Sequence, residues 1–233
     1  MKIHHHVAIR LRKAHDPKWV ERRVKIFLQY TYESLRRQTM TDFLVWLQMD
    51  PYGEKILTLP SGGPEVFVST GEDYDCILSR IPKDCDWIYS TRIDSDDVYR
   101  ADALALARDV LPGKGVTCSM FCTGYTHDVH TGRWGNYTVR STPFHTLMLP
   151  VSVYRDSAAM QSVHRRHGAI RDTYPTTLLP LDRFCALRHG CNTQTDERLK
   201  KSLGARGIPF PTTTPRHHPY KGKTLDDFIE GRF

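Results

Sequence analysis

The chain has 233 residues, 39% hydrophobic and 25% charged, with a formal net charge of +7 at pH 7. Its length and hydrophobic content suit a single sizeable domain with a real core, and the positive charge favours anionic partners in general. No apolar run approaches the roughly 20 residues of a membrane span and no signal peptide follows Met1, so we expect a cytoplasmic protein without a transmembrane segment.

The first elements alternate between strand and helix. Residues 5–11 are typical of a strand, residues 17–37 of a long helix and residues 42–49 of a second strand, which is the βαβ pattern. Asp16 suits the N-cap of the helix and Pro17 its first turn. Apolar residues at helical spacing predict its buried stripe: Val20, Val24, Phe27, Leu28, Thr31 and Leu35.

An acidic segment follows the next pair of strands, at 65–69 and 86–89. Residues 90–97 read Ser-Thr-Arg-Ile-Asp-Ser-Asp-Asp. Because strand residues two apart point the same way, Asp94 and Asp96 are expected on one face. Two anions so close need a cation, and carboxylate oxygens suit Mg²⁺ or Mn²⁺ whose other positions hold water and substrate phosphates. The segment therefore predicts a metal site for a diphosphate.

A simpler interpretation of this segment stays open. Ser95, Asp96 or Asp97 could cap a helix that begins near Arg100 and continues through the alanine-rich residues 101–107. The position favours a site, because ligands of open α/β sheets bind outside the carboxyl ends of the strands.

The second half of the chain is expected to contain four more strands, a helix and a tail. The strands are predicted at 115–121, 125–129, 132–139 and 146–154, the middle two as a hairpin, and the helix at 156–167. The tail is rich in proline. We therefore expect a domain over residues 1–203 and an extended arm over residues 204–233 that packs on it.

Four segments resemble nucleotide-sugar glycosyltransferases of the GT-A fold and, within them, the rhamnosyltransferase family. The resemblance implies an α/β class with one GT-A-like domain, whose mixed, mostly parallel sheet is flanked by helices. The segments are residues 16–27, residues 34–38 together with Phe43 and Trp46, the Thr-Arg-x-Asp-x-Asp-Asp element at 91–97, and residues 189–192.

The resemblance also implies roles for three side chains. Asp96 would bind a divalent ion directly, Asp94 would contact the ribose or join the metal through water, and His189 would be a further metal ligand. Carboxylate and imidazole together suit Mn²⁺, although Mg²⁺ is also expected. The alternative for His189 is a turn histidine before Gly190.

Two arginines are candidates for the nucleotide's phosphates. Arg92 precedes the acidic segment and could hold a phosphate, or else form an ion pair with Asp94 or Asp97. Arg10 and Arg12 end the first strand, and only one of them should point inward; Arg10 is preferred.

The inverting reaction of the family would need a general base for the acceptor hydroxyl. The stretch at 162–167, where such enzymes commonly have an acidic pair, contains no carboxylate. His164, Asp172 and Asp182 are the catalytic candidates. If none of them is the base, a retaining reaction or an inactive protein becomes more credible.

The sequence therefore favours a metal-dependent hexosyltransferase. It would move a sugar from a nucleoside-diphosphate donor to a hydroxyl of a glycan, a lipid carrier or a modified nucleic acid. One alternative is a nucleotidyltransferase, which usually has a glycine-rich loop after the first strand, whereas residues 11–15 contain no glycine. Another is a nucleic-acid-binding protein that uses the basic helix 17–37 with Tyr30 and Tyr32.

Overall fold

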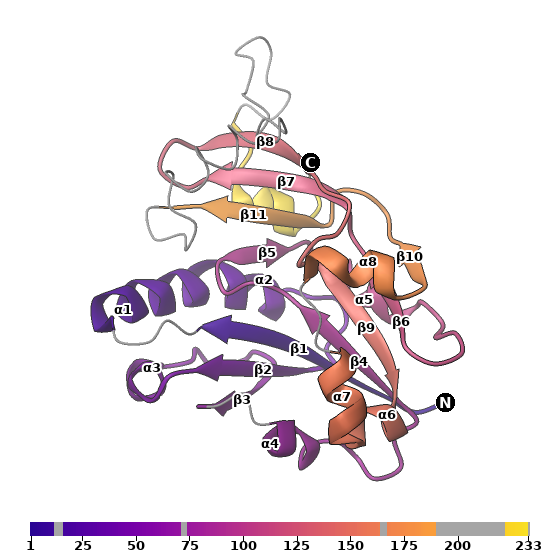
Figure 1. Cartoon of the computed structure of the whole chain (residues 1–233). Coiled ribbons are helices and arrows are strands. Elements are labelled where there is room, and N and C mark those ends of the chain that lie inside the picture. Colours follow the sequence, from indigo (N-terminus) through magenta and orange to yellow (C-terminus); the bar gives the residue numbers. More distant parts are fainter. Residues whose placement is uncertain (12–15, 71–73, 164–166, 190–221, 233) are drawn as a thin grey trace, which may run out of the picture.

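The structure is a computed structural model that describes residues 1–11, 16–70, 74–163, 167–189 and 222–232 (Figure 1). Its centre is a seven-stranded sheet in the order β10-β6-β9-β4-β1-β2-β3. These strands are β1 Ile3–Leu11, β2 Leu44–Met49, β3 Glu65–Ser69, β4 Trp87–Arg92, β6 Thr117–Met120, β9 His145–Pro150 and β10 Thr176–Leu178.

The central sheet is mostly parallel. Strand β1 lies in its interior and pairs in parallel with β2 and β4, while β9 runs antiparallel to both β4 and β6. The expected α/β class, with a mixed and mostly parallel sheet flanked by helices, is confirmed. The carboxyl ends of β1 and β4 consequently lie side by side on one edge of the sheet.

Helices cover both faces of this sheet, which explains why strand β2 is buried along its whole length. In β2, Val45 and Leu47 pack in one cluster with α1, whereas Leu44 and Trp46 pack in another. The second cluster also contains residues of α4, α6 and α7. The helices are α1 Pro17–Ile26, α2 Glu33–Arg36, α3 Pro51–Ile56, α4 Tyr74–Leu78, α5 Ala103–Arg108, α6 Val151–Arg155, α7 Ser157–Val163, α8 Ile170–Thr173 and α10 Leu225–Ile229, with a 3-10 turn η2 at His167–Ala169.

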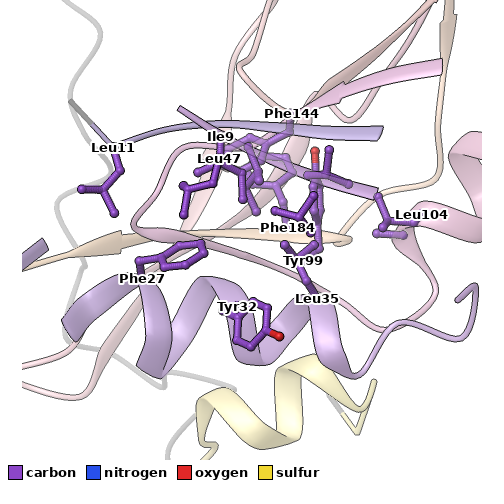
Figure 2. Packing of buried hydrophobic residues seen from close by; sticks show 14 of the residues in the cluster. Ile9, Leu11, Phe27, Tyr32, Leu35, Leu47, Tyr99, Leu104, Phe144 and Phe184 are labelled. Atoms are coloured by element: carbon purple, nitrogen blue, oxygen red, sulfur yellow. The ribbon is translucent and has the colours of Figure 1, made fainter. Parts of the chain in front are cut away.

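The long helix expected at 17–37 is confirmed, with one irregularity. Asp16 accepts a hydrogen bond from the Trp19 amide and caps α1. A π-helical turn, η1 at Phe27–Tyr32, joins α1 to α2. The apolar side of this helix packs with strand residues in the larger cluster, and Figure 2 shows Phe27 and Leu35 on that side.

A second sheet of four strands stands beyond α1 and α2 in Figure 1. Its order is β5-β11-β7-β8, and β11 pairs in parallel with β7 and antiparallel with β5. The expected hairpin is confirmed as the antiparallel pair of β7 and β8. The strands are β5 Asp97–Tyr99, β7 Thr123–Asp128, β8 Arg133–Thr138 and β11 Phe184–Arg188.

Two sequence expectations fail locally. The strand predicted at 146–154 ends at Pro150, and α6 follows it at once because Tyr154 turns into the second core cluster. The helix predicted near Arg100 begins only at Ala103, after strand β5, and its N-cap residue Asp102 makes no side-chain capping bond. Ser95, Asp96 and Asp97 therefore do not cap it.

The described part of the C-terminal arm is not extended. Thr224 and Asp227 form a reciprocal capping box that starts α10, and Phe228 is buried against Tyr125 and Trp134 of the second sheet. The predicted boundary between residues 203 and 204 lies outside the described residues. Among the described helices, none is long and apolar enough to cross a membrane.

Candidate functional site

The acidic segment lies at the carboxyl end of β4, next to that of β1. Strand β4 ends at Arg92, and residues 94–97 form a turn closed by a 3.1 Å hydrogen bond from the Asp97 amide to the Asp94 carbonyl. Because the strand has ended, the expected placement of Asp94 and Asp96 on one strand face is wrong. The two carboxylates have different partners.

Asp96 belongs to a buried polar cluster with Arg23 and His189. The Arg23 Nη1 atom lies 2.5 Å from Asp96 Oδ2 and 3.1 Å from His189 Nε2. His189 Nε2 lies 2.9 Å from the same Asp96 oxygen. Exposure is 5% for Arg23, 5% for Asp96 and 8% for His189, so the three polar groups meet away from bulk water.

Three distant segments bring this cluster together. Arg23 comes from α1, Asp96 from the turn after β4, and His189 from the residue after β11. Strand β11 is held beside β5 by antiparallel pairing, which places Ala186 opposite Asp97. The Leu187 amide also donates to Asp97 Oδ1 at 3.1 Å. These contacts return the end of β11 to the acidic turn.

Arg23 is fixed on more than one side. Its Nε donates to Ser95 Oγ at 3.0 Å, and its guanidinium carbon lies 5.2 Å from the centre of the Trp19 ring. A planar guanidinium is suited to such multiple contacts, because its donors point in fixed directions. The helix therefore presents a positioned cation to Asp96.

Asp94, Arg92 and Arg10 form the more exposed part of the same edge. Arg92 donates to Asp94 at 3.0 Å, and the side chains are 31% and 41% exposed. Arg10 is exposed and its Nε donates to Gln48 of the neighbouring strand at 3.2 Å. Because Ala8 is paired with Arg92, Arg10 lies two residues further along the adjacent strand and faces the same side. The expected ion pair of Arg92 with Asp94 is present.

Burial changes the acid chemistry around the turn. Desolvation of Asp97, helped by the charges of Asp96 and Asp94, raises the pKa of that carboxyl well above its usual range. Burial likewise raises the pKa of the Tyr99 phenol, whose hydroxyl donates to the Arg92 carbonyl at 2.8 Å. Tyr137 follows the same rule, because burial raises its pKa to about 12. Burial therefore favours the protonated form of each of these groups.

The candidates for general base are not part of the cluster in the described residues. Asp172 lies on α8 at the surface and pairs with Arg140 at 2.5 Å. Asp182 precedes β11, whereas His189 follows it, so the two residues lie at opposite ends of a strand that is about 17 Å long at 3.4 Å per residue. His164 lies outside the described residues.

Arg23 was not recognised from sequence as a member of the site. A signal was present, because Arg23 is three residues after Val20 and four before Phe27, on the apolar stripe of α1. A charged residue on a buried helix face requires a partner. Within the basic helix 17–37, which the sequence offers as a surface for nucleic acid, Arg23 is therefore a buried residue and not an exposed one.

Asp96 and His189 have donor atoms that fit a divalent ion. Two ligands of one octahedral ion, each about 2.1 Å from it, lie about 3 Å apart when adjacent, and the observed separation is 2.9 Å. Carboxylate with imidazole suits Mn²⁺. No group of three histidine, cysteine, aspartate or glutamate side chains converges within the described ranges, so the remaining positions would fall to water and substrate.

Comparisons with known proteins give fold likeness only. No family model matches the chain, and no curated protein matches it. Two solved structures similar to it are an inositol-1-phosphate CTP transferase from T. maritima and TarS from S. aureus. The first has 10% identity and a TM-score of 0.42, over 88% of this chain and 97% of the other. TarS has 13% identity and a TM-score of 0.45, over 81% of this chain and 37% of the other.

Proposed function

We propose that this protein is a nucleotide-sugar-dependent glycosyltransferase of GT-A type, acting on a hydroxyl acceptor. The observation that carries the proposal is the buried cluster of Asp96, Arg23 and His189 at the carboxyl edge of β4. Ligands of open α/β sheets bind at this edge. The sequence resemblance to the rhamnosyltransferase family adds support, but the sugar itself stays undetermined.

The residues at the edge divide into two groups with complementary tasks. Arg10 and Arg92 offer exposed or half-exposed guanidinium groups to the donor's phosphates, which they match in fork geometry. Asp94 would then accept hydrogen bonds from the ribose hydroxyls, once the Arg92 side chain has left it to bind a phosphate. The buried cluster lies behind them and supplies fixed charge at low dielectric, where electrostatic contacts are strongest.

Asp96 and His189 would hold Mn²⁺ or Mg²⁺, and the alternative role of Asp94 is to join the ion through water. The ion, when bound, neutralises charge that develops on the leaving diphosphate. The protein's own contribution is to keep both donor atoms 2.9 Å apart and shielded from solvent. The turn that carries Asp96 is fixed by the hydrogen bond from Leu187 to Asp97.

In the reaction the acceptor oxygen forms a bond to the sugar's anomeric carbon while the bond to the diphosphate breaks. The nucleoside diphosphate leaves with the electron pair, and the hydroxyl proton passes to a base. His164, Asp172 and Asp182 remain our candidates for that base in an inverting reaction. Asp172→Asn, Asp182→Asn and His164→Gln should identify the base among the three candidates. Only the variant that lacks the base should have a lower kcat with unchanged donor affinity.

The test of donor binding is a thermal-shift panel with UDP-, GDP-, dTDP- and CDP-linked sugars, with and without Mn²⁺. A ligand that binds only the native state raises the melting temperature by mass action. We expect one nucleotide to give a Mn²⁺-dependent shift that Asp96→Ala abolishes. The matched control is Asp109→Ala, a carboxylate after α5 outside the site. Absence of any shift with every donor would contradict the proposal.

Product analysis distinguishes the sequence-based alternative. A glycosyltransferase releases a nucleoside diphosphate, whereas a nucleotidyltransferase consumes a nucleoside triphosphate and releases pyrophosphate. We expect nucleoside diphosphate. Pyrophosphate release that depends on Asp96 would contradict the proposal and support a nucleotidyltransferase. Salt-sensitive binding to duplex DNA would identify a nucleic-acid acceptor.

A further inference from the structure

We propose that Arg23 and a divalent cation are alternative occupants of Asp96 and His189, so that the metal site opens only when the Arg23 guanidinium leaves it. The inference rests on the metal assignment made above. It adds an internal competitor for the ion.

The guanidinium stands where a shared cation would stand. Arg23 Nη1 is within hydrogen-bond distance of Asp96 Oδ2 and of His189 Nε2, the two atoms that fit a metal. Nη1 carries two hydrogens and no acceptor lone pair, so it can face both atoms only as a donor. A metal at these atoms would require the same electron pairs and would meet a second positive charge.

Burial makes the two occupants exclusive. All three side chains are almost fully buried. A carboxylate in such surroundings needs a positive partner, and two cations on one carboxylate oxygen would repel each other strongly. Either the guanidinium or the metal therefore satisfies Asp96, and the change between them requires Arg23 to move.

Arg23 is held in the occupied state by contacts beyond Asp96. Ser95 accepts from its Nε, and Trp19 lies beside the guanidinium. Metal must replace this set of contacts. A hydrogen bond to a charged group corresponds to a factor of about ten to a hundred in affinity, so metal binding to the free protein should be weakened by that factor.

The donor's diphosphate supplies the missing exchange partner. It offers Arg23 a bidentate anion in place of Asp96, while the metal takes the freed carboxylate. Donor and metal should consequently bind with positive cooperativity, and the coupling should be reciprocal. An arginine that could not leave would give no such coupling.

The test is a titration of the protein with Mn²⁺ alone, followed by the electron paramagnetic resonance signal of free Mn²⁺. We expect Arg23→Met to bind Mn²⁺ at least about tenfold more tightly than the wild type. Arg22→Met is the matched control, because it removes the same charge from an exposed position on the same helix, and it should behave as the wild type. Adding Asp96→Asn to Arg23→Met should abolish the gain.

Arg23→Lys keeps the test decisive if Arg23→Met fails to fold. Lysine preserves the charge but lacks the fork that reaches Ser95, Asp96 and His189 together, so it too should bind Mn²⁺ more tightly than the wild type. The inference is overturned if neither variant exceeds Arg22→Met. If the wild type then binds Mn²⁺ tightly through Asp96, the proposed metal site survives this failure; if no protein binds Mn²⁺ and no donor gives a thermal shift, both proposals fail.

Discussion

The two ends of the β1–β4 pair bury polar side chains in opposite ways. Near the start of β1, His5 and His6 are buried with no acidic neighbour in the described part of the chain, and desolvation lowers the pKa of His6 to about 3 and that of His5 well below its usual value. Beyond the end of β4, Asp96 is buried beside Arg23. At the first end, burial without a counter-charge favours the neutral form of the imidazoles, whereas at the second end a carboxylate is buried in contact with a guanidinium, and each partner of that ion pair could instead bind a charged group of a ligand.

The largest effect is expected when the counter-charge of Asp96, the Arg23 guanidinium, is removed. We expect Arg23→Met to lower the free energy of unfolding by about 3–5 kcal/mol, because it leaves a buried carboxylate without its partner. Urea denaturation measures the loss. Asp96→Asn in the same chain should restore most of it, and Arg22→Met should change stability by less than about 0.5 kcal/mol.

Equal losses in Arg23→Met and Arg22→Met would contradict the ion pair's role in stability. That result would mean that Asp96 loses its ion-pair partner with no more effect on stability than the loss of an exposed charge. The two ends of the β1–β4 pair would then not differ in their need for a counter-charge.

The histidine end can be tested by pH. The folded pKa of His6 is below the unfolded value near 6.5, so its contribution to stability is complete above pH 6.5 and is lost as pH falls towards 3. Each such histidine should lower the free energy of unfolding by about 1.4 kcal/mol for every pH unit that the pH falls within that range. His6 packs against Trp46 and Tyr154, so His6→Phe can occupy the same aromatic site.

We expect the unfolding free energy of His6→Phe to fall less steeply between pH 6 and pH 4.5, by about 1.4 kcal/mol per pH unit relative to the wild type. Urea titrations at several pH values give both slopes. Parallel slopes for the two proteins would show that His6 is protonated in the folded state, in conflict with burial as the dominant influence.

The smallest expected effect concerns a candidate base. Asp182 has a φ of 64°, in the left-handed region that aspartate tolerates better than most residues and glycine better still. Asp182→Gly should change the free energy of unfolding by no more than about 1 kcal/mol. A large loss of kcat in this stable variant would support Asp182 as the base, while unchanged kcat would reduce it to a turn residue.

Local patterns predicted much of the central sheet and one hairpin of the second sheet. The alternation of strand and helix in the first half, the capped helix at Pro17 and the β7–β8 hairpin all follow from periodicity and turn chemistry within short windows. His189 was proposed beside Asp96 from the family resemblance, and the structure brings the two within 2.9 Å.

The rest depends on contacts that no short window contains. Strand β5 has three residues and β11 five, too few for a clear period, and their pairing joins Asp97 to Ala186. Without that pairing the acidic turn resembles a helix cap. For Arg23, the place on the apolar stripe indicates that the residue needs a partner, but nothing nearby in the sequence indicates that this partner is 73 positions away.

The spacing of the three cluster residues also orders their appearance during synthesis. Arg23 precedes Asp96 by 73 positions, and His189 follows it by 93. The guanidinium is therefore available to the carboxylate while the 93 positions up to His189 are still to be made, before the imidazole exists. In the growing chain, Arg23 can therefore act as the partner of Asp96 whether or not divalent ions are present. The site is completed only when β11 and His189 have been added.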